Sequence, residues 1–262
     1  MSLSDEELER YARHIVLREI GGTGQARLKA ARVLLVGAGG IGSPAIQYLA
    51  AAGVGHLAVI DDDKVALSNL QRQTLYGTRD IGHEKVVAAS IAARKINPHT
   101  DFEAIKERIT AANALRLIEG IDVVVDGSDN FATRLAVADA CLRHRTPLIS
   151  AAVAEFEGQL AVYRGWEASK PCYRCFVGDD PEREGVTCAE QGVLGALTGV
   201  MGSLAALEAI RAIVPFGEDP AGKLLLVDAL GFRFRTLALP KDSGCPGCGA
   251  GHRENAIAGA RS

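Results

Sequence analysis

The sequence lacks the features that mark secreted, nucleic-acid-binding and membrane proteins. Residues 1–17 are charged and contain no apolar core of a secretory signal. The formal net charge of −3 and the scattered basic side chains do not support a nucleic-acid surface. Residues 192–207 form a charge-free stretch of 16 residues with four glycines, which is too short and polar to span a bilayer. We therefore expect a cytoplasmic protein with no membrane and no nucleic-acid partner.

Internal repeats are also missing, and low complexity is confined to a short tail after Gly249. With 262 residues, 48% hydrophobic and 23% charged, the chain is long enough to bury one large α/β core. We expect a single domain over residues 1–262, made of a first half at 1–150, a second half at 151–249 and a tail at 250–262. The stretch at 192–207 then predicts a buried helix or an interface helix.

Cysteine is scarce, but four of the six cysteines form two Cys-x-x-Cys motifs, Cys172/Cys175 and Cys245/Cys248. Two such motifs suit a four-thiolate Zn²⁺ site, which leaves no coordination position open for catalysis. Two disulfides or a redox pair are the alternatives, and disulfides would need an oxidising compartment. We favour structural zinc, which would close a loop of 69 residues between Cys175 and Cys245.

Apolar strands alternate with helices over the first 150 residues. Ser4 and Glu7 predict a capping box that opens a helical segment, and Gly21-Gly22 predicts its end. A strand at 33–36, a glycine turn, a helix to about Ala52 and a strand at 56–60 form a unit typical of a parallel sheet. Further elements are expected as strands at 102–105, 121–125 and 147–151 and as helices at 83–96, 111–118 and 131–143.

Alternating patterns at 158–163, 223–227 and 232–239 predict antiparallel strands in the second half. The expected fold class is therefore α/β, a Rossmann-like, doubly wound mixed sheet. Its N-terminal part would be parallel and its C-terminal strands antiparallel, with the four-cysteine zinc knuckle attached.

A glycine loop follows the first strand. Gly37, Gly39 and Gly42 match the dinucleotide fingerprint, and Asp61 at the end of the next strand suits a ribose hydroxyl. Taken alone, this pattern fits a nicotinamide oxidoreductase equally well. The polar run at 68–73 and Lys85 argue against a nicotinamide oxidoreductase, because hydride transfer needs no such cluster.

Three charged residues each have two interpretations. Lys85 in a first helical turn opposes the helix dipole, which favours a bound anion over a solvated lysine. The Arg72 guanidinium suits phosphate oxygens, although it could also pair with an acid at the surface. Asp129 follows a strand, where it could cap the next helix or, with Ser128 as the cap, hold Mg²⁺ on a triphosphate.

These motifs together resemble the ubiquitin-activating-like adenylyltransferases of the MoeB/ThiF/HesA superfamily. The resemblance extends from about Asp5 to Gly249. The motifs that carry it, in chain order, are Arg13, the loop with Gly37, Gly39, Gly40 and Gly42, then Asp61, Ser68, Asn69, Leu70, Gln71, Arg72 and Gln73, then Lys85, Ser128, Asp129 and Asn130, and both cysteine pairs.

The resemblance implies a reaction. Members of this family use magnesium-ATP to adenylate the C-terminal glycine of a small ubiquitin-like sulfur-carrier protein, which ends in Gly-Gly, and release pyrophosphate. The first half would bind the nucleotide and the second half the carrier and zinc. ATP, Mg²⁺ and Zn²⁺ are the cofactors that it implies, and a separate enzyme would donate the sulfur, since no rhodanese domain follows Cys248.

Individual roles follow from the same resemblance. Gly40 and Asp61 would bind the nucleotide, Asn69, Arg72 and Lys85 its phosphates, and Asp129 the magnesium. Arg13 would reach the site of a neighbouring subunit, which requires a homodimer; by itself it reads as a surface partner of Glu9. The helix near 200–210, with Gly202, Ser203 and Ala205, is a candidate dimer interface. Cys188 is a candidate for a covalent link to the carrier.

The carrier is most simply the small subunit of molybdopterin synthase, because the segments around Cys172 and Cys188 look closest to MoeB. The thiamine-pathway carrier is the alternative, supported by residues 61–63 and by the knuckle at Cys245. A nicotinamide oxidoreductase and a nonenzymatic carrier-binding scaffold represent other classes, but the first leaves Arg72, Lys85 and Asp129 unused and the second does not require them.

Overall fold

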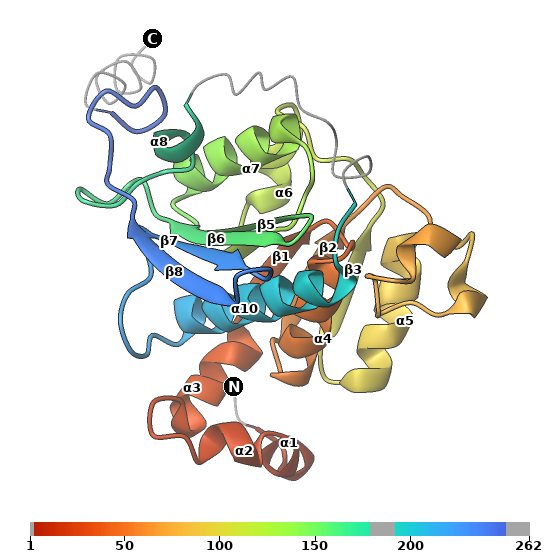
Figure 1. Cartoon of the computed structure of the whole chain (residues 1–262). Helices are drawn as coiled ribbons and strands as arrows, with labels where there is room; N and C mark the ends of the chain where they lie inside the picture. Colours follow the sequence, from red (N-terminus) through yellow and green to blue (C-terminus); the bar gives the residue numbers. More distant parts are fainter. Residues whose placement is uncertain (1–2, 179–191, 250–262) are drawn as a thin grey trace.

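One mixed sheet organises the computed structural model, which describes residues 3–178 and 192–249 (Figure 1). Within that part of the chain the sheet has eight strands in the order β3-β2-β1-β4-β5-β6-β7-β8. Strands β1 to β5 are parallel, and β6 to β8 continue the sheet in antiparallel pairs. The predicted fold class, including the change from parallel to antiparallel, is confirmed.

The central parallel strands β1, β2 and β4 are short, largely buried runs, whereas β3 is a more exposed edge strand. The bounds of the parallel strands are Arg32–Val36 for β1, His56–Ile60 for β2, Asp101–Ile105 for β3, Val123–Asp126 for β4 and Leu148–Ala154 for β5. Every residue of β4 is buried, as is every residue of β1 after Arg32. Such unbroken apolar sequences are typical of strands that carry helices on both sides.

The antiparallel strands are β6, Glu157–Tyr163, β7, Lys223–Asp228, and β8, Arg233–Ala238. Leu160 of β6 pairs with Leu225 of β7, which itself pairs with Thr236 of β8. All six residues of β8 are exposed. The sheet therefore ends in an open edge strand.

Helices cover the sheet in two layers, seen above and below it in Figure 1. One layer contains α3, Gly21–Ala30, α4, Gly42–Ala51, α5, Lys85–Ile96, and α10, Gly195–Ile213. The other contains α6, Ala114–Ile118, α7, Phe131–His144, and α8, Arg174–Val177. Two apolar cores result, one on each face of the sheet.

The N-terminal segment differs from its prediction at one end. The Ser4 hydroxyl accepts a hydrogen bond from the Glu7 amide at 3.3 Å, and the Ser4 amide donates to the Glu7 carboxylate at 2.8 Å, so the capping box that opens α1, Asp5–Arg10, is confirmed. Helix α2, Ala12–Ile15, then ends before the glycines, and Gly21 begins α3. The predicted stop was wrong because the good helix formers Gln25 to Ala30 follow the glycines and carry the helix.

Helix α10 is longer than its predicted stretch. It has 19 residues with a mean hydropathy of 1.4, so by length and composition it could span a membrane, which corrects the expectation from 192–207. Its small residues pack inside the chain, because Ala205 is fully buried and a Cβ on Gly202 would lie 2.2 Å from the Ile41 carbonyl oxygen. Gly202 and Ala205 thus bring α10 against α4 and the sheet, and were wrongly assigned to a subunit interface.

Candidate functional site

A cleft of about 460 Å³ opens at the carboxyl ends of β1, β2 and β4. The sheet order reverses between β1 and β4, and open α/β sheets bind ligands at such a switch point. Most predicted site residues line this cleft, namely Gly37, Gly39, Gly40, Asp61, Asn69, Arg72, Lys85, Ser128, Asp129 and Asn130.

The glycine loop forms the floor between β1 and α4. Gly37 has φ of +92°, which favours glycine, and a Cβ on Gly42 would lie 2.0 Å from the Gly37 carbonyl oxygen. Gly42 therefore closes the turn and does not line the cleft. The amides of Gly39 and Gly40 have no acceptor among the described residues, so they remain available to an anion at the start of α4.

Asp61 connects the end of β2 to the glycine loop. Its two carboxylate oxygens accept hydrogen bonds from the amides of Ala38 and Asp63, each at 2.8 Å. Burial raises the pKa of Asp61, and the Lys85 charge opposes this only in part. Each oxygen retains a lone pair, because an ionised carboxylate can accept about four hydrogen bonds. Asp61 can thus hold the loop and still accept from a hydroxyl in the cleft.

Lys85 is buried at the start of α5, with 5% of its surface exposed. Its ammonium lies 2.7 Å from an Asp63 carboxylate oxygen and 3.9 Å from one of Asp61. The solvated-lysine interpretation is therefore wrong. The two carboxylates also compensate for the unfavourable dipole at this helix end, a role that the sequence assigned to a bound anion.

Asn69 ends a short 3₁₀ turn, η1, Leu67–Asn69, and the Arg72 amide donates to the Asn69 carbonyl at 3.0 Å. The Asn69 side chain accepts from the Ala66 amide at 3.1 Å, and Arg72 donates to the Ser68 carbonyl at 3.1 Å. Within the described chain Arg72 has no carboxylate partner, so its guanidinium can bind an anion in the cleft.

Ser68, Leu70 and Gln71 do not line the cleft, although they belong to the same motif. Ser68 contributes its carbonyl to Arg72, and Leu70 packs on the apolar core. The Gln71 backbone faces α10, since a Cβ on Gly195 would lie 2.2 Å from its carbonyl oxygen. These three residues shape the loop that presents Asn69 and Arg72.

In the loop after β4, one residue caps α7 and another has no polar partner among the described residues. Asn130 caps α7, because its side chain accepts from the Thr133 amide at 2.8 Å. The sequence predicted either Asp129 or Ser128 as the cap of this helix, and both predictions of the cap were wrong. The exposed Asp129 carboxylate makes no hydrogen bond or ion pair with a described residue, and the Ser128 hydroxyl also lacks a partner. Asp129 therefore remains available to a cation.

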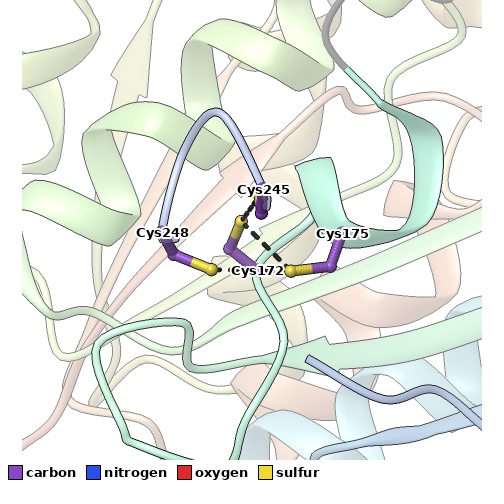
Figure 2. A group of neighbouring side chains, drawn as sticks. All are labelled: Cys172, Cys175, Cys245 and Cys248. Atoms are coloured by element: carbon purple, nitrogen blue, oxygen red, sulfur yellow. Dashed lines mark hydrogen bonds between the residues drawn. The ribbon is translucent and has the colours of Figure 1, made fainter. Parts of the chain in front are cut away.

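The four cysteines of the two motifs meet beside α8 and α7 (Figure 2). Cys172 lies 3.9 Å from Cys175 and 3.5 Å from Cys245 between sulfur atoms, and Cys175 lies 3.5 Å from Cys248. All four are free thiols, which excludes the paired disulfides within the described chain. Sulfurs bound to one zinc ion at about 2.3 Å would be about 3.8 Å apart. The cluster thus has the size of a four-thiolate metal site.

Backbone and side-chain contacts hold this cluster in place. The amides of Asp242 and Gly247 donate to Cys175 and Cys245 sulfurs at 3.5 and 3.4 Å. Arg174, between the first two cysteines, forms two bonds of 2.8 Å with the Asp139 carboxylate on α7. The knuckle therefore joins the C-terminal segment to the helix layer above the sheet.

Comparison with known proteins agrees with these features. The ThiF family matches residues 11–247, which is most of the chain. This protein belongs to the ThiF family. The superfamily resemblance predicted from the motifs is thereby confirmed.

Curated relatives of this ThiF-family chain are named adenylyltransferases or activating enzymes. The chain is 45% identical to the sulfur carrier protein adenylyltransferase of Thermus thermophilus, over 95% of this chain and 93% of that protein. It is 44% identical to the SAMP-activating enzyme E1 of Haloferax volcanii, over 96% and 92%. The bovine adenylyltransferase and sulfurtransferase MOCS3 is 48% identical over 95% of this chain, which spans only 54% of that protein.

Solved structures support the fold of the ThiF-family chain. E. coli MccB with ATP superposes with a TM-score of 0.79 at 23% identity, over 94% of this chain and 75% of that one. MccB with MccA-N7isoASN gives a TM-score of 0.80, over 92% and 74%. At this identity the likeness concerns the fold alone.

Two further predicted residues, Arg13 and Cys188, belong to other parts of the ThiF-family chain. Arg13 is exposed on α2 and does not line the cleft of its own chain. It forms no ion pair with Glu9 or with another described residue, so the surface-pair interpretation is not observed. Cys188 lies outside the described residues.

Arg134 and Gln73 are among the cleft residues to which sequence reasoning assigned no role. Arg134, on the first turns of α7, donates to the carbonyls of Ser128 and Ala151 and thereby ties the Asp129 loop to β5. Gln73 belongs to the recognised motif but received no role, although it is 3% exposed and lines the cleft. The position of Arg134, four residues after the cap Asn130, was the one available signal, because it places the side chain one turn above the loop.

Proposed function

We propose that this ThiF-family protein adenylates the C-terminal glycine of a small ubiquitin-like sulfur-carrier protein. The observation that carries the proposal is the composition of the cleft. Lys85, Arg72 and the uncoordinated Asp129 carboxylate line it above a glycine loop with open amides. The names of relatives with about 45% identity over nearly the whole chain support the same activity.

The reaction joins a carboxylate oxygen of the carrier to the α-phosphorus of ATP and breaks the bond from that phosphorus to the bridging oxygen of pyrophosphate. No protein nucleophile is required, so catalysis depends on alignment and charge neutralisation. Asp61 would accept from the ribose, and the amides of Gly39 and Gly40 would hold phosphate oxygens. Asn69, Arg72 and Lys85 would contact the phosphates, and the two cations among them would neutralise the developing charge.

Magnesium fits the Asp129 position. Its carboxylate is exposed and unpartnered within the described chain, and oxygen ligands with phosphates are the preferred surroundings of Mg²⁺. When bound there, the ion would supply positive charge to the triphosphate.

Zinc fits the four cysteines. Sulfur separations of 3.5 to 3.9 Å and amide donors to two of the sulfurs suit a tetrahedral thiolate site with a structural role. The ion would fasten the segment after β8 to the body.

A homodimer would give Arg13 its function. The side chain is exposed, unpaired among the described residues and outside its own cleft, which supports a role in the site of a second copy. The proposal keeps the division into a nucleotide-binding half at 1–150, a carrier-binding and zinc half at 151–249 and a tail at 250–262. It also keeps a cytoplasmic location, a separate sulfur donor and a candidate covalent role for Cys188.

The molybdopterin synthase small subunit is the carrier that we propose, with the thiamine-pathway carrier as the alternative. The test is carrier-dependent exchange of labelled pyrophosphate into ATP, run with each carrier separately. Exchange with the molybdopterin carrier alone supports the proposal, exchange with the thiamine carrier alone changes the pathway, and no exchange with either contradicts it. Asp129→Ala should abolish exchange, while the protein without ATP stays folded. Full exchange by this variant would contradict the assignment of Asp129 to magnesium.

A further inference from the structure

Gln73 is a buried side chain whose amide has no partner. It is 3% exposed, its side-chain oxygen lacks a hydrogen bond, and no described residue pairs with its side-chain nitrogen. Buried amides almost always have partners, because leaving one unsatisfied is costly. Since Gln73 lines the cleft, a ligand in the cleft is the natural partner.

The position of Gln73 is rigidly held. Its backbone amide donates to the Asn69 carbonyl at 2.9 Å, and its carbonyl accepts from the Tyr76 amide at 3.1 Å. The Tyr76 hydroxyl in turn donates to the Ala38 carbonyl at 2.8 Å, which connects this turn to the glycine loop. The turn that carries Gln73 is therefore held beside the loop, which places its side chain for substrate binding.

Gln73 lies where two different walls of the cleft meet. Its side-chain nitrogen would be 3.7 Å from a Cβ on Gly39, and a Cβ on the adjacent Gly40 would be 3.1 Å from Thr198. On one side are the charged groups suited to a nucleotide, Asp61, Asp63, Arg72, Lys85 and Asp129. The other wall carries mostly uncharged residues, Ala152, Val153, Gln159, Val193 and Thr198, with Arg134 hydrogen-bonded to the carbonyls of Ser128 and Ala151. A wall with few charged side chains suits a peptide without charged side chains better than a triphosphate.

Beside the glycine loop, the chemistry of a primary amide favours a terminal glycine over a phosphate group. It presents a donor and an acceptor side by side. A terminal glycine offers the complementary pair, a carboxylate oxygen that accepts and a peptide N–H that donates, whereas phosphate oxygens can only accept. We propose that Gln73 binds the terminal glycine of the acyl substrate and aligns its carboxylate beside the glycine loop. This inference rests on the proposed function and assigns a residue to its second substrate.

The test compares Gln73→Leu, Gln73→Glu and a matched control, Gln47→Glu, which changes a half-buried glutamine of α4 outside the cleft. Binding of a synthetic peptide ending in Gly-Gly is measured with ATP present and without turnover, next to ATP binding alone. The wild-type protein should prefer the free carboxylate over the same peptide ending in a carboxamide.

Gln73→Leu should weaken binding of the carboxylate peptide by roughly 10- to 100-fold, the range for one lost hydrogen bond to a charged group, and should reduce the preference over the carboxamide. Gln73→Glu should bind more weakly still, because its carboxylate repels that of the peptide. ATP affinity and the midpoint of thermal unfolding should stay near wild type in Gln73→Leu, as in Gln47→Glu. Gln73→Glu is compared for peptide binding alone, because a buried carboxylate beside the glycine loop also repels phosphate.

Equal peptide binding by wild type and Gln73→Leu would overturn the inference, as would a parallel loss of ATP affinity. A drop in thermal midpoint that accounts for the lost binding would likewise assign Gln73 to the fold and overturn it. Peptide binding that depends on Gln73, without pyrophosphate exchange, would support the inference. It would contradict only the proposed function.

Discussion

The Lys85 ammonium lies 2.7 Å from the Asp63 carboxylate, inside a cleft in which it is expected to meet phosphate. Lys85 is buried, while 59% of the Asp63 side chain is exposed. Without nucleotide, the Asp63 carboxylate compensates the buried positive charge of Lys85. With nucleotide, the Asp63 charge competes with phosphate for the same ammonium.

Asp63→Asn is therefore expected to bind ATP a few-fold more tightly than wild type, because a negative charge near the phosphates is removed. The gain should shrink as ionic strength rises, since Asp63 is exposed to solvent. Titration calorimetry at low and high salt measures both effects. Asp62→Asn is the matched control, because it removes the same charge from a neighbour that pairs with Arg108 instead. Weaker ATP binding by Asp63→Asn would show that Asp63 positions Lys85.

Asp61 should make the stability of the ligand-free protein depend on pH. Burial raises its pKa in the folded state, so the folded protein binds this proton more readily than the unfolded chain. Its contribution to the free energy of unfolding is thus highest below the unfolded pKa of about 4 and falls as pH rises through the folded pKa. Thermal midpoints measured upward from pH 4 should fall more in wild type than in Asp61→Asn. Parallel curves for the two proteins would contradict this expectation.

Arg13 and Lys85 should complement each other across subunits. Arg13→Ala and Lys85→Ala homodimers are each expected to lose carrier-dependent exchange by at least about 100-fold, the scale for a lost charge-stabilising group. A mixed dimer of the two should regain activity, because one of its sites combines an intact Lys85 with an intact Arg13 of the other copy. Exchange is measured after co-expression with two affinity tags. An inactive mixed dimer would mean that Arg13 serves its own chain or none.

Removal of the metal should destabilise the protein without changing the chemistry of the cleft. Cys245→Ser is expected to lose bound zinc and to lower the thermal midpoint, because a four-thiolate site holds the segment after β8 in place. Metal content by mass spectrometry and thermal unfolding measure this. Cys141→Ala is the control, since this buried cysteine lies outside the cluster. Equal zinc in wild type and Cys245→Ser would contradict the assignment.

Local patterns in the sequence were sufficient for most of the fold. Strand β2 was predicted with its observed bounds, His56–Ile60, because an apolar run between turn residues is a local signal. The glycine loop and the clustering of the cysteine pairs could also be predicted, because Gly37 occupies a backbone conformation that favours glycine and each cysteine pair has a fixed spacing. Strand direction followed from the connections between elements.

Only the tertiary structure decided which partner each polar side chain has. Lys85 meets Asp63, Asn130 caps α7 in place of its neighbours, and Gly202 packs on α4. Gln73 has an amide without a partner, which a sequence cannot reveal. A sequence motif determines which groups are available, but hydrogen bonds act over about 3 Å, and distances on that scale are set by how distant segments pack.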